Sequence, residues 1–363
     1  MLLVAVLGYI PAAFFITLVC LFLVKAGFAE TRATYEKNTE FELGIYISSR
    51  SPFGCAPVEL VCSLPDKDTG LFSNKKIFAA IAPFGKCRIS ALCMHRYRGS
   101  YTAKLERVAV YDPLRIIRLS KKVNAEMTQI FLPRRISLGG FDASASGELH
   151  SPLSRMISGE REDFSHVREY SDGDLIQLVH WKLTAKTNEL MIKQYDENSE
   201  QRALVLCDFG FEGYPAGALM YADSVIETAI SFAMASMEAG VTVTVDFGAD
   251  NPGLVSRISD RAGFERFYEL MSMIPAKLDV LPFAELIKSS ANTAASVVFL
   301  VTAGMDEEIL LAAEQLAAGF PGLVVLAHVD PAGTKPADSP EGSFLFIDLV
   351  GDTAKALSEF AGT

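Results

Sequence analysis

The densest group of residues that could do chemistry lies between Ile157 and Tyr195. Five charged residues fall within fifteen positions there, beside the only tryptophan, Trp181. They are Arg168, Glu169, Asp172, Asp174 and Lys182. Such a cluster can form an internal ion-pair network that holds a loop in place, or it can bind a partner or a ligand. Both uses shift the pKa values of the charged groups, so such shifts would not separate them. The residue types alone leave the two interpretations open.

Turn and capping signals predict the local structure of this segment. Asp172-Gly173 is typical of a turn, because glycine adopts a positive φ without steric cost. Asp174 then predicts a helix start, with Gln177 completing a capping box. One buried face of that helix would carry Leu178, Trp181 and Ala185. A strand over residues 190–195 should follow, and we expect the tryptophan to be buried.

The same segment resembles the signature of a bacterial family, the domain of unknown function 58 family. The candidate partner-binding positions that this signature defines are Arg168, Glu169, Tyr170, Gly173, Asp174, His180, Trp181 and Lys182. Three positions depart from the usual form. His180 replaces the family's usual aspartate, and Lys186 replaces its usual arginine. Leu178 occupies the position of a second usual arginine or the position next to it.

The first 24 residues contain no charged side chain and predict a transmembrane helix over residues 1–24. Such a helix is about 36 Å long, against roughly 30 Å of hydrocarbon. Lys25 and Arg32 follow it, so the positive-inside rule predicts that the remaining chain is cytoplasmic, below a single-pass anchor in the inner membrane. A signal peptide cleaved near residues 27–29 is the alternative, but a basic region before the apolar stretch is missing. The resemblance implies two adjacent membrane helices, and this sequence has room for one.

Residues 30–135 predict a β-rich domain. Apolar and other residues alternate from Phe41 to Ile47, and short apolar runs follow at 58–64 and 77–81. Two elements, Arg98-Gly99-Ser100-Tyr101 and Asp112-Pro113-Leu114, resemble parts of a small β-sandwich in the family. Arg115 stands where the family has glycine.

Residues 203–363 alternate between strand and helix patterns, which predicts a mostly parallel sheet with helices on both faces. Expected strands cover residues 203–208, 241–247, 297–302, 323–328 and 344–350, and expected helices cover 223–238, 257–274 and 306–318. Residues 136–202 form the signature segment before this α/β domain. The resemblance implies that the domain is a degenerate von Willebrand factor A-like domain, with a Rossmann-like fold.

That resemblance also implies a position for a metal, and the sequence has lost most of it. Such domains hold a divalent ion with Asp-x-Ser-x-Ser after the first strand and an aspartate after a later one. Here Asp208 is kept, both serines are absent, and Ala303 replaces the later acid. We therefore predict no bound metal and an Asp208 that hydrogen-bonds its own loop. The alternative is a metal-dependent ligand-binding protein, or an uncharacterised enzyme, that uses Asp208 with Asp172, Asp174 or Glu212.

Charge is distributed unevenly along the chain, whose formal net charge is −11. Residues 86–135 carry twelve basic and three acidic side chains, whereas residues 203–363 carry seven basic and twenty-two acidic ones. An anionic inner leaflet would attract the basic segment, although a solvated sheet face explains it as well. No recognised nucleic-acid motif accompanies the basic residues, so we expect no nucleic-acid partner.

The sequence lacks the usual catalytic motifs, including a nucleophile elbow, a phosphate-binding loop and a His-Glu-x-x-His pair. Five cysteines lie beyond the membrane segment, and this odd number favours reduced thiols. Cys207 falls inside an apolar strand, which favours a core position over a nucleophile. We expect no catalytic residue and no cofactor.

These observations predict a membrane-anchored, non-catalytic scaffold or interaction protein. The family resemblance implies a MoxR-type AAA+ ATPase as a partner, alongside a transglutaminase-like membrane protein. It further implies work in cell-envelope or protein-complex assembly.

Overall fold

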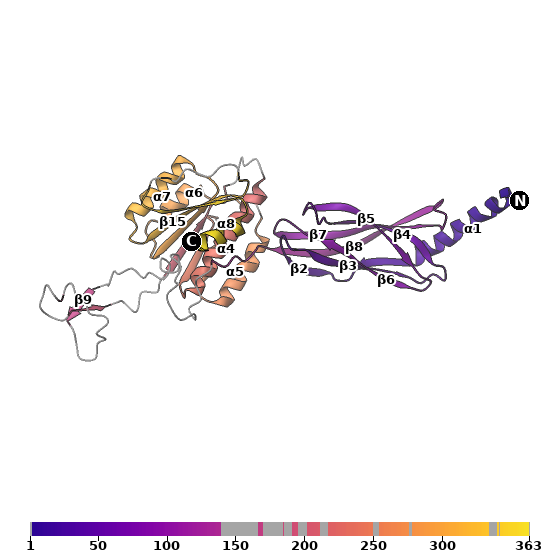
Figure 1. The fold of residues 1–363 in the computed structure, drawn as a ribbon, viewed down its shortest axis with the longest axis horizontal. Coiled ribbons are helices and arrows are strands. Elements are labelled where there is room, and N and C mark those ends of the chain that lie inside the picture. The colour runs from indigo at the N-terminus through magenta and orange to yellow at the C-terminus, as the bar shows by residue number, and fades with distance from the viewer. Residues whose placement is uncertain are drawn as a thin grey trace. The chain divides into compact units, whose positions relative to one another are not determined.

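The structure is a computed structural model, shown in Figure 1, which describes residues 2–138, 166–169, 184, 191–194, 202–210, 217–249, 254–275, 278–333, 340 and 342–362. The chain divides into two compact units. The first comprises Met1–Arg134 and Glu269–Pro275, and the second comprises Arg135–Tyr268 and Ala276–Thr363.

The first unit is β-rich and follows an N-terminal helix, α1 (Leu2–Leu23). One antiparallel sheet has the order β1-β3-β6, formed by Val24–Phe28, Phe41–Ser49 and Lys86–Cys93. The other has the order β2-β8-β7-β4-β5, formed by Arg32–Glu36, Arg118–Leu132, Gly99–Tyr111, Cys55–Pro65 and Phe72–Ile81. Residues of both sheets share one core, among them Ile45 and Leu60. This is a two-sheet sandwich arrangement, and each predicted strand lies within a longer observed one.

The C-terminal half of α1 packs against this core. Its buried residues are Ala13, Thr17, Cys20 and Leu21, followed by Val24, which starts β1. Their spacing places them along one helix face. Lys121 donates to the carbonyls of Phe22 and Val24, where a cation is favourable at a helix C-terminus. The predicted membrane segment is therefore helical, but its later residues also serve the sandwich core, which composition alone does not show.

The Arg-Gly-x-Tyr element has a structural use within the first unit. Arg98 is fully buried, and its Nη1 donates to the carbonyls of Met271 and Ile274 at 3.1 and 2.5 Å. These carbonyls belong to the last turn of α5 (Arg261–Met273) and to the residue after it. Gly99 has a φ of 131°, and the Tyr101 hydroxyl donates to the Arg98 carbonyl. The arginine thus stabilises carbonyls that a helix end leaves without intrahelical partners.

The second unit contains a six-stranded sheet of order β13-β12-β11-β14-β15-β16. In this order the strands are Ser256–Ile258, Thr242–Asp246, Arg202–Cys207, Val297–Thr302, Leu323–Asp330 and Leu345–Val350. Every neighbouring pair is parallel except β12 and β13. The predicted mostly parallel sheet is therefore confirmed.

Helices cover both faces of this sheet (Figure 1). One face packs against α6 (Phe283–Ser289) and α7 (Glu307–Gly319), through side chains such as Leu300 and Leu326. The opposite face packs against α4 (Ala218–Glu238), where the Phe232 and Phe299 rings stack with centroids 4.4 Å apart. The C-terminal α8 (Thr353–Gly362) also belongs to this unit.

One helix among the described residues, α4, is long and apolar enough to cross a membrane. Most of its side chains are buried inside the second unit. The hydroxyls of Thr228, Ser231 and Ser236 donate to carbonyls four residues earlier, so these polar groups are satisfied within the helix. Packing on the sheet thus explains the apolar composition of α4. The described side chains of α1, from Gly8 to Leu23, form a shorter apolar stretch.

The predicted helix over residues 257–274 is wrong at its start. Ser256–Ile258 form β13, because the buried Ile258 pairs with Val243 of β12. Asp260 then accepts a hydrogen bond from the Gly263 amide at 2.6 Å, and α5 covers Arg261–Met273. Helices α6 and α8 were not predicted from the sequence, because they are only seven and ten residues long and give little periodic signal.

Candidate functional site

The start of the signature segment lies on a short antiparallel strand pair. Strand β9 (His166–Glu169) pairs with β10 (Met191–Gln194), and Glu169 lies opposite Met191. Arg168 is the next residue along, opposite Ile192. The expected strand near residues 190–195 is confirmed as β10. The other signature candidates lie outside the described residues, as does the predicted helix that would bury the tryptophan: Tyr170, Gly173, Asp174, His180, Trp181 and Lys182.

Asp208 follows β11 at the carboxyl edge of the parallel sheet, where open α/β sheets bind ligands. Its Oδ2 accepts the Thr302 hydroxyl at 2.7 Å, and its Oδ1 accepts the Gly210 amide at 2.9 Å. Only 7% of the residue is exposed. The Gly210 contact is the loop hydrogen bond that the sequence predicts. Both carboxylate oxygens are thus engaged inside the protein.

Burial dominates the electrostatics of this carboxyl. Desolvation raises the pKa of Asp208, and the nearby Asp306 carboxylate raises it further. The hydrogen bonds from Gly210 and Thr302 act in the opposite direction without cancelling the effect. A proton is therefore held more tightly here than on an exposed aspartate.

The described residues around Asp208 do not fit a divalent metal. Magnesium prefers six oxygen ligands, several of them waters. The first ligand position here is a largely buried carboxylate, and Ala303 occupies the position of the second acid. Asp306 is the residue that precedes α7. Within the described ranges, no group of three or more histidines, cysteines or acids could hold a metal ion. Glu212 and the Asp172/Asp174 loop lie outside those ranges.

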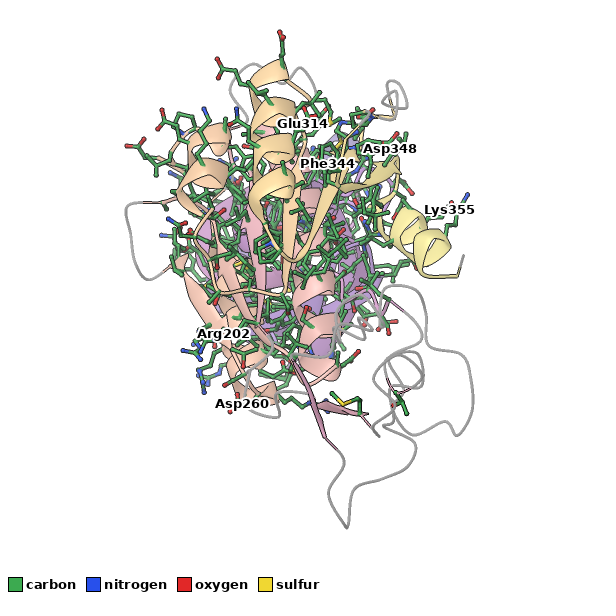
Figure 2. All side chains as sticks on the ribbon, turned by 90° about the vertical axis from the view of Figure 1, so that its left-hand side faces the viewer. Arg202, Asp260, Glu314, Phe344, Asp348 and Lys355 are labelled. Atoms are coloured by element: carbon green, nitrogen blue, oxygen red, sulfur yellow. The ribbon has the colours of Figure 1, made fainter. Side chains whose placement is uncertain are left out.

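A row of polar residues continues from Asp208 across the sheet. Thr302 pairs in register with His328, and His328 pairs with Asp348. His328 Nδ1 lies 2.7 Å from an Asp348 oxygen, and both side chains are largely buried. Because side chains alternate along a strand, the row shares the face of Leu300 and Leu326, which packs on α6 and α7. Figure 2 labels Asp348 and, well apart from it, Arg202.

The His328–Asp348 pair resembles half of a catalytic arrangement, and the described part of the chain shows no nucleophile bonded to its imidazole. A carboxylate can orient an imidazole for proton transfer, and the imidazole then needs a nucleophile within hydrogen-bonding distance. The neighbouring Thr302 hydroxyl bonds to Asp208 instead. The pair therefore links two strands. This pair was not predicted from the sequence, because only the register of β15 and β16 brings the two residues together.

The six cysteines are free, and none of the shifted thiols favours nucleophilic chemistry. Cys207 is buried within the sheet, and desolvation raises its pKa well above the usual value. Burial likewise raises the pKa of Cys62 to about 12. Because the thiolate is the reactive form, these groups are core residues. For Cys207 this agrees with the sequence prediction.

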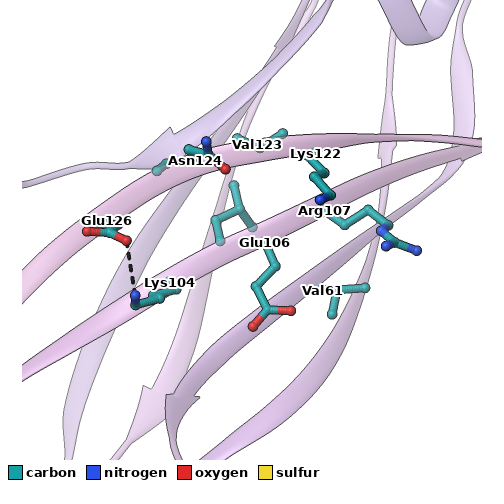
Figure 3. A pocket seen from close by; sticks show the side chains of 10 residues that line it. Val61, Lys104, Glu106, Arg107, Lys122, Val123, Asn124 and Glu126 are labelled. Atoms are coloured by element: carbon teal, nitrogen blue, oxygen red, sulfur yellow. Dashed lines mark ion pairs between the residues drawn. The ribbon is translucent and has the colours of Figure 1, made fainter.

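An open pocket of about 540 Å³ lies on the five-stranded sheet of the first unit (Figure 3). It lies beside the irregularity in β7 between Leu105 and Arg107. Its charged lining residues are Lys104, Glu106, Arg107, Lys122 and Glu126. Lys104 and Glu126 form an ion pair at 3.1 Å, while Glu106 and Arg107 point apart. The charged side chains of this pocket have both signs, and two of them are already paired with each other. The lining therefore does not indicate which kind of ligand would bind here.

The two units define a protein with one β-sandwich domain and one α/β domain built on a mixed sheet. Residues 166–319 match the family described as "Protein of unknown function DUF58", which supports membership of that family for this part of the chain. No curated protein matches the chain.

Three similar solved structures share little with this chain. A CARDB domain from Pyrococcus furiosus is 10% identical, covers 30% of this chain and 87% of its own, and has a TM-score of 0.22. An alkylpurine DNA glycosylase from Pseudomonas fluorescens is 16% identical, covers 29% and 30%, and has a TM-score of 0.18. An exo-β-N-acetylglucosaminidase from Vibrio harveyi is 8% identical, covers 92% and 79%, and has a TM-score of 0.20. At these scores they carry no functional argument.

Proposed function

We propose that this chain is a membrane-anchored interaction protein that catalyses no reaction itself. The observation that carries the proposal is the closed carboxyl edge of the α/β sheet. Both carboxylate oxygens of Asp208 accept hydrogen bonds, one from the Thr302 hydroxyl and one from the Gly210 amide. Ala303 stands where a second acid would be needed. The described residues of this edge offer no set of three acidic, histidine or cysteine ligands, which supports docking of a protein over binding of a metal-linked ligand.

The α/β unit, in this proposal, is a degenerate von Willebrand factor A-like domain. A six-stranded, mostly parallel sheet with helices on both faces supports it, as does the position of Asp208 directly after β11. The hydroxyl of Thr302, at the end of the neighbouring β14, replaces a metal as the partner of that carboxylate.

We further propose a MoxR-type AAA+ ATPase as the docked partner, with the soluble domains in the cytoplasm. Residues 203–363 carry a net charge of −15, counted from the sequence. A partner for this surface should present lysine or arginine, and its association rate should fall as salt rises, because charges at an interface rim mainly steer the encounter. Arg168 and Asp174 in the signature segment are expected to act on the dissociation rate instead.

The test is direct binding of the full chain, in detergent or nanodiscs, to a purified MoxR-type ATPase at low and high salt. Arg168→Ala and Asp174→Ala should each speed dissociation several-fold. The matched control is Lys355→Ala, an exposed change on α8 that should leave the dissociation rate unchanged. Equal effects from the control would remove the signature from the proposal. Complete absence of binding at low salt would remove the ATPase as partner.

The metal-dependent alternative has its own experiment. A ligand that binds only the native state raises stability by RT ln(1 + [L]/Kd). We expect millimolar magnesium or calcium to leave the melting temperature unchanged. A rise of several degrees that Asp208→Ala abolishes would favour the ligand-binding alternative.

A further inference from the structure

Three loops gather at the end of the first unit where α1 joins the sandwich. They are residues 50–54, 82–85 and 112–117, and together we name them the α1-end surface. The Arg50 amide donates to the Leu23 carbonyl at 3.3 Å, and the Phe84 amide donates to the Ser51 carbonyl at 3.0 Å. The Tyr9 hydroxyl donates to Asp112 at 2.6 Å, which ties the third loop to the helix.

The tips of these loops carry large apolar side chains in solvent. Phe53, Phe84, Leu114 and Ile116 are 41%, 68%, 63% and 64% exposed. The exposed face of α1 continues the same character with Ile10, Phe14, Phe15 and Phe22. Single exposed apolar residues are ordinary, but a cluster at one end of a domain marks an interaction site.

The charges on the α1-end surface are basic. Arg50 and Arg115 are exposed within the loops, and Lys25 and Lys86 are exposed just beside them. The only acid in the three loops, Asp112, is buried and accepts the amides of Leu114 and Ile117. The exposed charge at this end is therefore positive.

Two of these side chains stand at backbone positions that disfavour them. Phe84 has a φ of 53° and Arg115 a φ of 58°. A left-handed conformation is costly for residues other than glycine, although asparagine tolerates it. Arg115 is also the position at which the sequence resemblance expects glycine. Both side chains are exposed, and unfavourable conformations of this kind cluster at functional sites.

We infer that the α1-end surface docks onto an anionic lipid bilayer. The apolar tips enter the interfacial layer, and the arginines and lysines contact the lipid phosphates. The inference rests on the membrane anchoring in the proposed function. Charge complementarity favours lipid over a second copy of this chain, because two basic surfaces repel. Continuity with the apolar face of α1 places the loops at the depth where aromatic and basic residues act as interfacial anchors.

The test reconstitutes the full chain into vesicles that contain brominated lipids, with and without phosphatidylglycerol. Phe84→Trp introduces a fluorophore at the α1-end surface. The matched control, Leu71→Trp, introduces one at an exposed site in the turn between β4 and β5, at the other end of the sandwich. Trp181 contributes the same background to both variants. We expect bromine to quench the Phe84→Trp signal at least several-fold more strongly than the control, and more in anionic than in neutral vesicles.

A second substitution separates lipid contact from misfolding. Adding Arg115→Gly to the Phe84→Trp protein removes a cation and places glycine at a positive φ. The melting temperature should not fall, while the extra quenching in anionic vesicles should drop several-fold. A loss of quenching in a protein that is at least as stable supports the inference.

The remaining outcomes distinguish this inference from the proposed function. Protein that floats with vesicles but shows equal quenching at both positions overturns the lipid contact and leaves the anchoring intact. Protein that does not float overturns the anchoring, and the inference falls with it. Lipid-independent dimerisation that Phe84→Gly abolishes would assign the surface to a second copy and overturn the inference.

Discussion

The carboxyl edge of the α/β sheet and the α1-end surface use their side chains in opposite ways. At the sheet edge, polar groups are buried and bond to one another, as in the Asp208–Thr302 and His328–Asp348 pairs. At the α1-end surface, apolar and basic groups are exposed, and Phe84 and Arg115 occupy unfavourable backbone positions. Asp208 at the sheet edge therefore has a structural use, whereas the loops of the α1-end surface leave apolar and basic side chains exposed to solvent.

The two long apolar helices show the same contrast. Helix α4 buries most of its length against the sheet, whereas α1 buries one face and exposes another. Apolar composition alone therefore does not show what covers a helix. The contacts of each helix face show it for the described residues.

The largest loss of stability should come from removing a large buried side chain from α4, and this tests whether α4 is a core helix. Phe232 is fully buried and stacks on Phe299. Phe232→Ala should destabilise the second unit by about 3–5 kcal/mol, because truncation leaves a cavity. Chemical denaturation measures this. The control Leu311→Ala, at a residue 52% exposed on α7, should cost less than roughly 0.5 kcal/mol. Similar values for the two variants would contradict the core assignment of α4.

The next largest effect should come from opening the sheet edge. Asp208→Ala removes the acceptor of the Thr302 hydroxyl and of the Gly210 amide. A buried donor that loses its acceptor costs about 1–3 kcal/mol. The cost should fall at the lower end of this range, because the Thr302 hydroxyl can still donate to the Gly304 carbonyl 3.0 Å away. A stability unchanged within error would show that the edge is open to solvent.

Asp208→Asn is the control, and it isolates the titration of this carboxyl. Burial raises the pKa of Asp208 in the folded protein above its unfolded value of about 3.9. Its stabilising contribution is therefore complete below the unfolded pKa and is lost as pH rises through the folded pKa. The stability of the Asn variant relative to the parent should rise with pH across that window and then level off. Denaturation at a series of pH values checks the sign.

Local signals predicted the elements, and long-range pairing decided the site. Alternation in Phe41–Ile47 and the apolar run of Val297–Thr302 were enough to predict β3 and β14. The strand β13 was missed because a three-residue strand next to a helix has no periodicity of its own. Asp208 was singled out through the family resemblance, as the aspartate that follows the first strand, whereas its partner Thr302 lies 94 residues away.

The α1-end surface shows the same limit. Phe53, Phe84 and Leu114 are far apart in the sequence, and each looks like an ordinary apolar residue near a turn. Only the antiparallel register of β3, β6 and β4 with their neighbours brings the three loops to one end. The departure from glycine at Arg115 was visible in the sequence, but its meaning required the φ angle.

A smaller effect is expected from the pair that links β15 and β16. A double-mutant cycle of His328→Ala and Asp348→Ala should give a coupling of about 1 kcal/mol, the usual contribution of a buried hydrogen bond. The matched control is the exposed pair of Lys355 and Glu359 on α8, 3.7 Å apart, whose coupling should lie between zero and roughly 0.5 kcal/mol. Equal couplings would mean that the edge pair is solvated like a surface pair.

The smallest predicted change is a gain in stability at the α1-end surface. A left-handed conformation costs an ordinary residue about 1–2 kcal/mol, and glycine costs roughly 0.5–1 kcal/mol in lost chain entropy. Arg115→Gly should therefore stabilise the first unit by about 0.5–1 kcal/mol, since the first term outweighs the second. The control is Asn38→Gly, at a φ of 59°, which should gain less because asparagine tolerates this conformation. Denaturant titration of the two variants decides the matter. If Arg115→Gly were destabilising, the arginine side chain would contribute to folding. The contrast between a sheet edge whose polar groups bond to one another and loops whose side chains are free for a partner would then no longer hold.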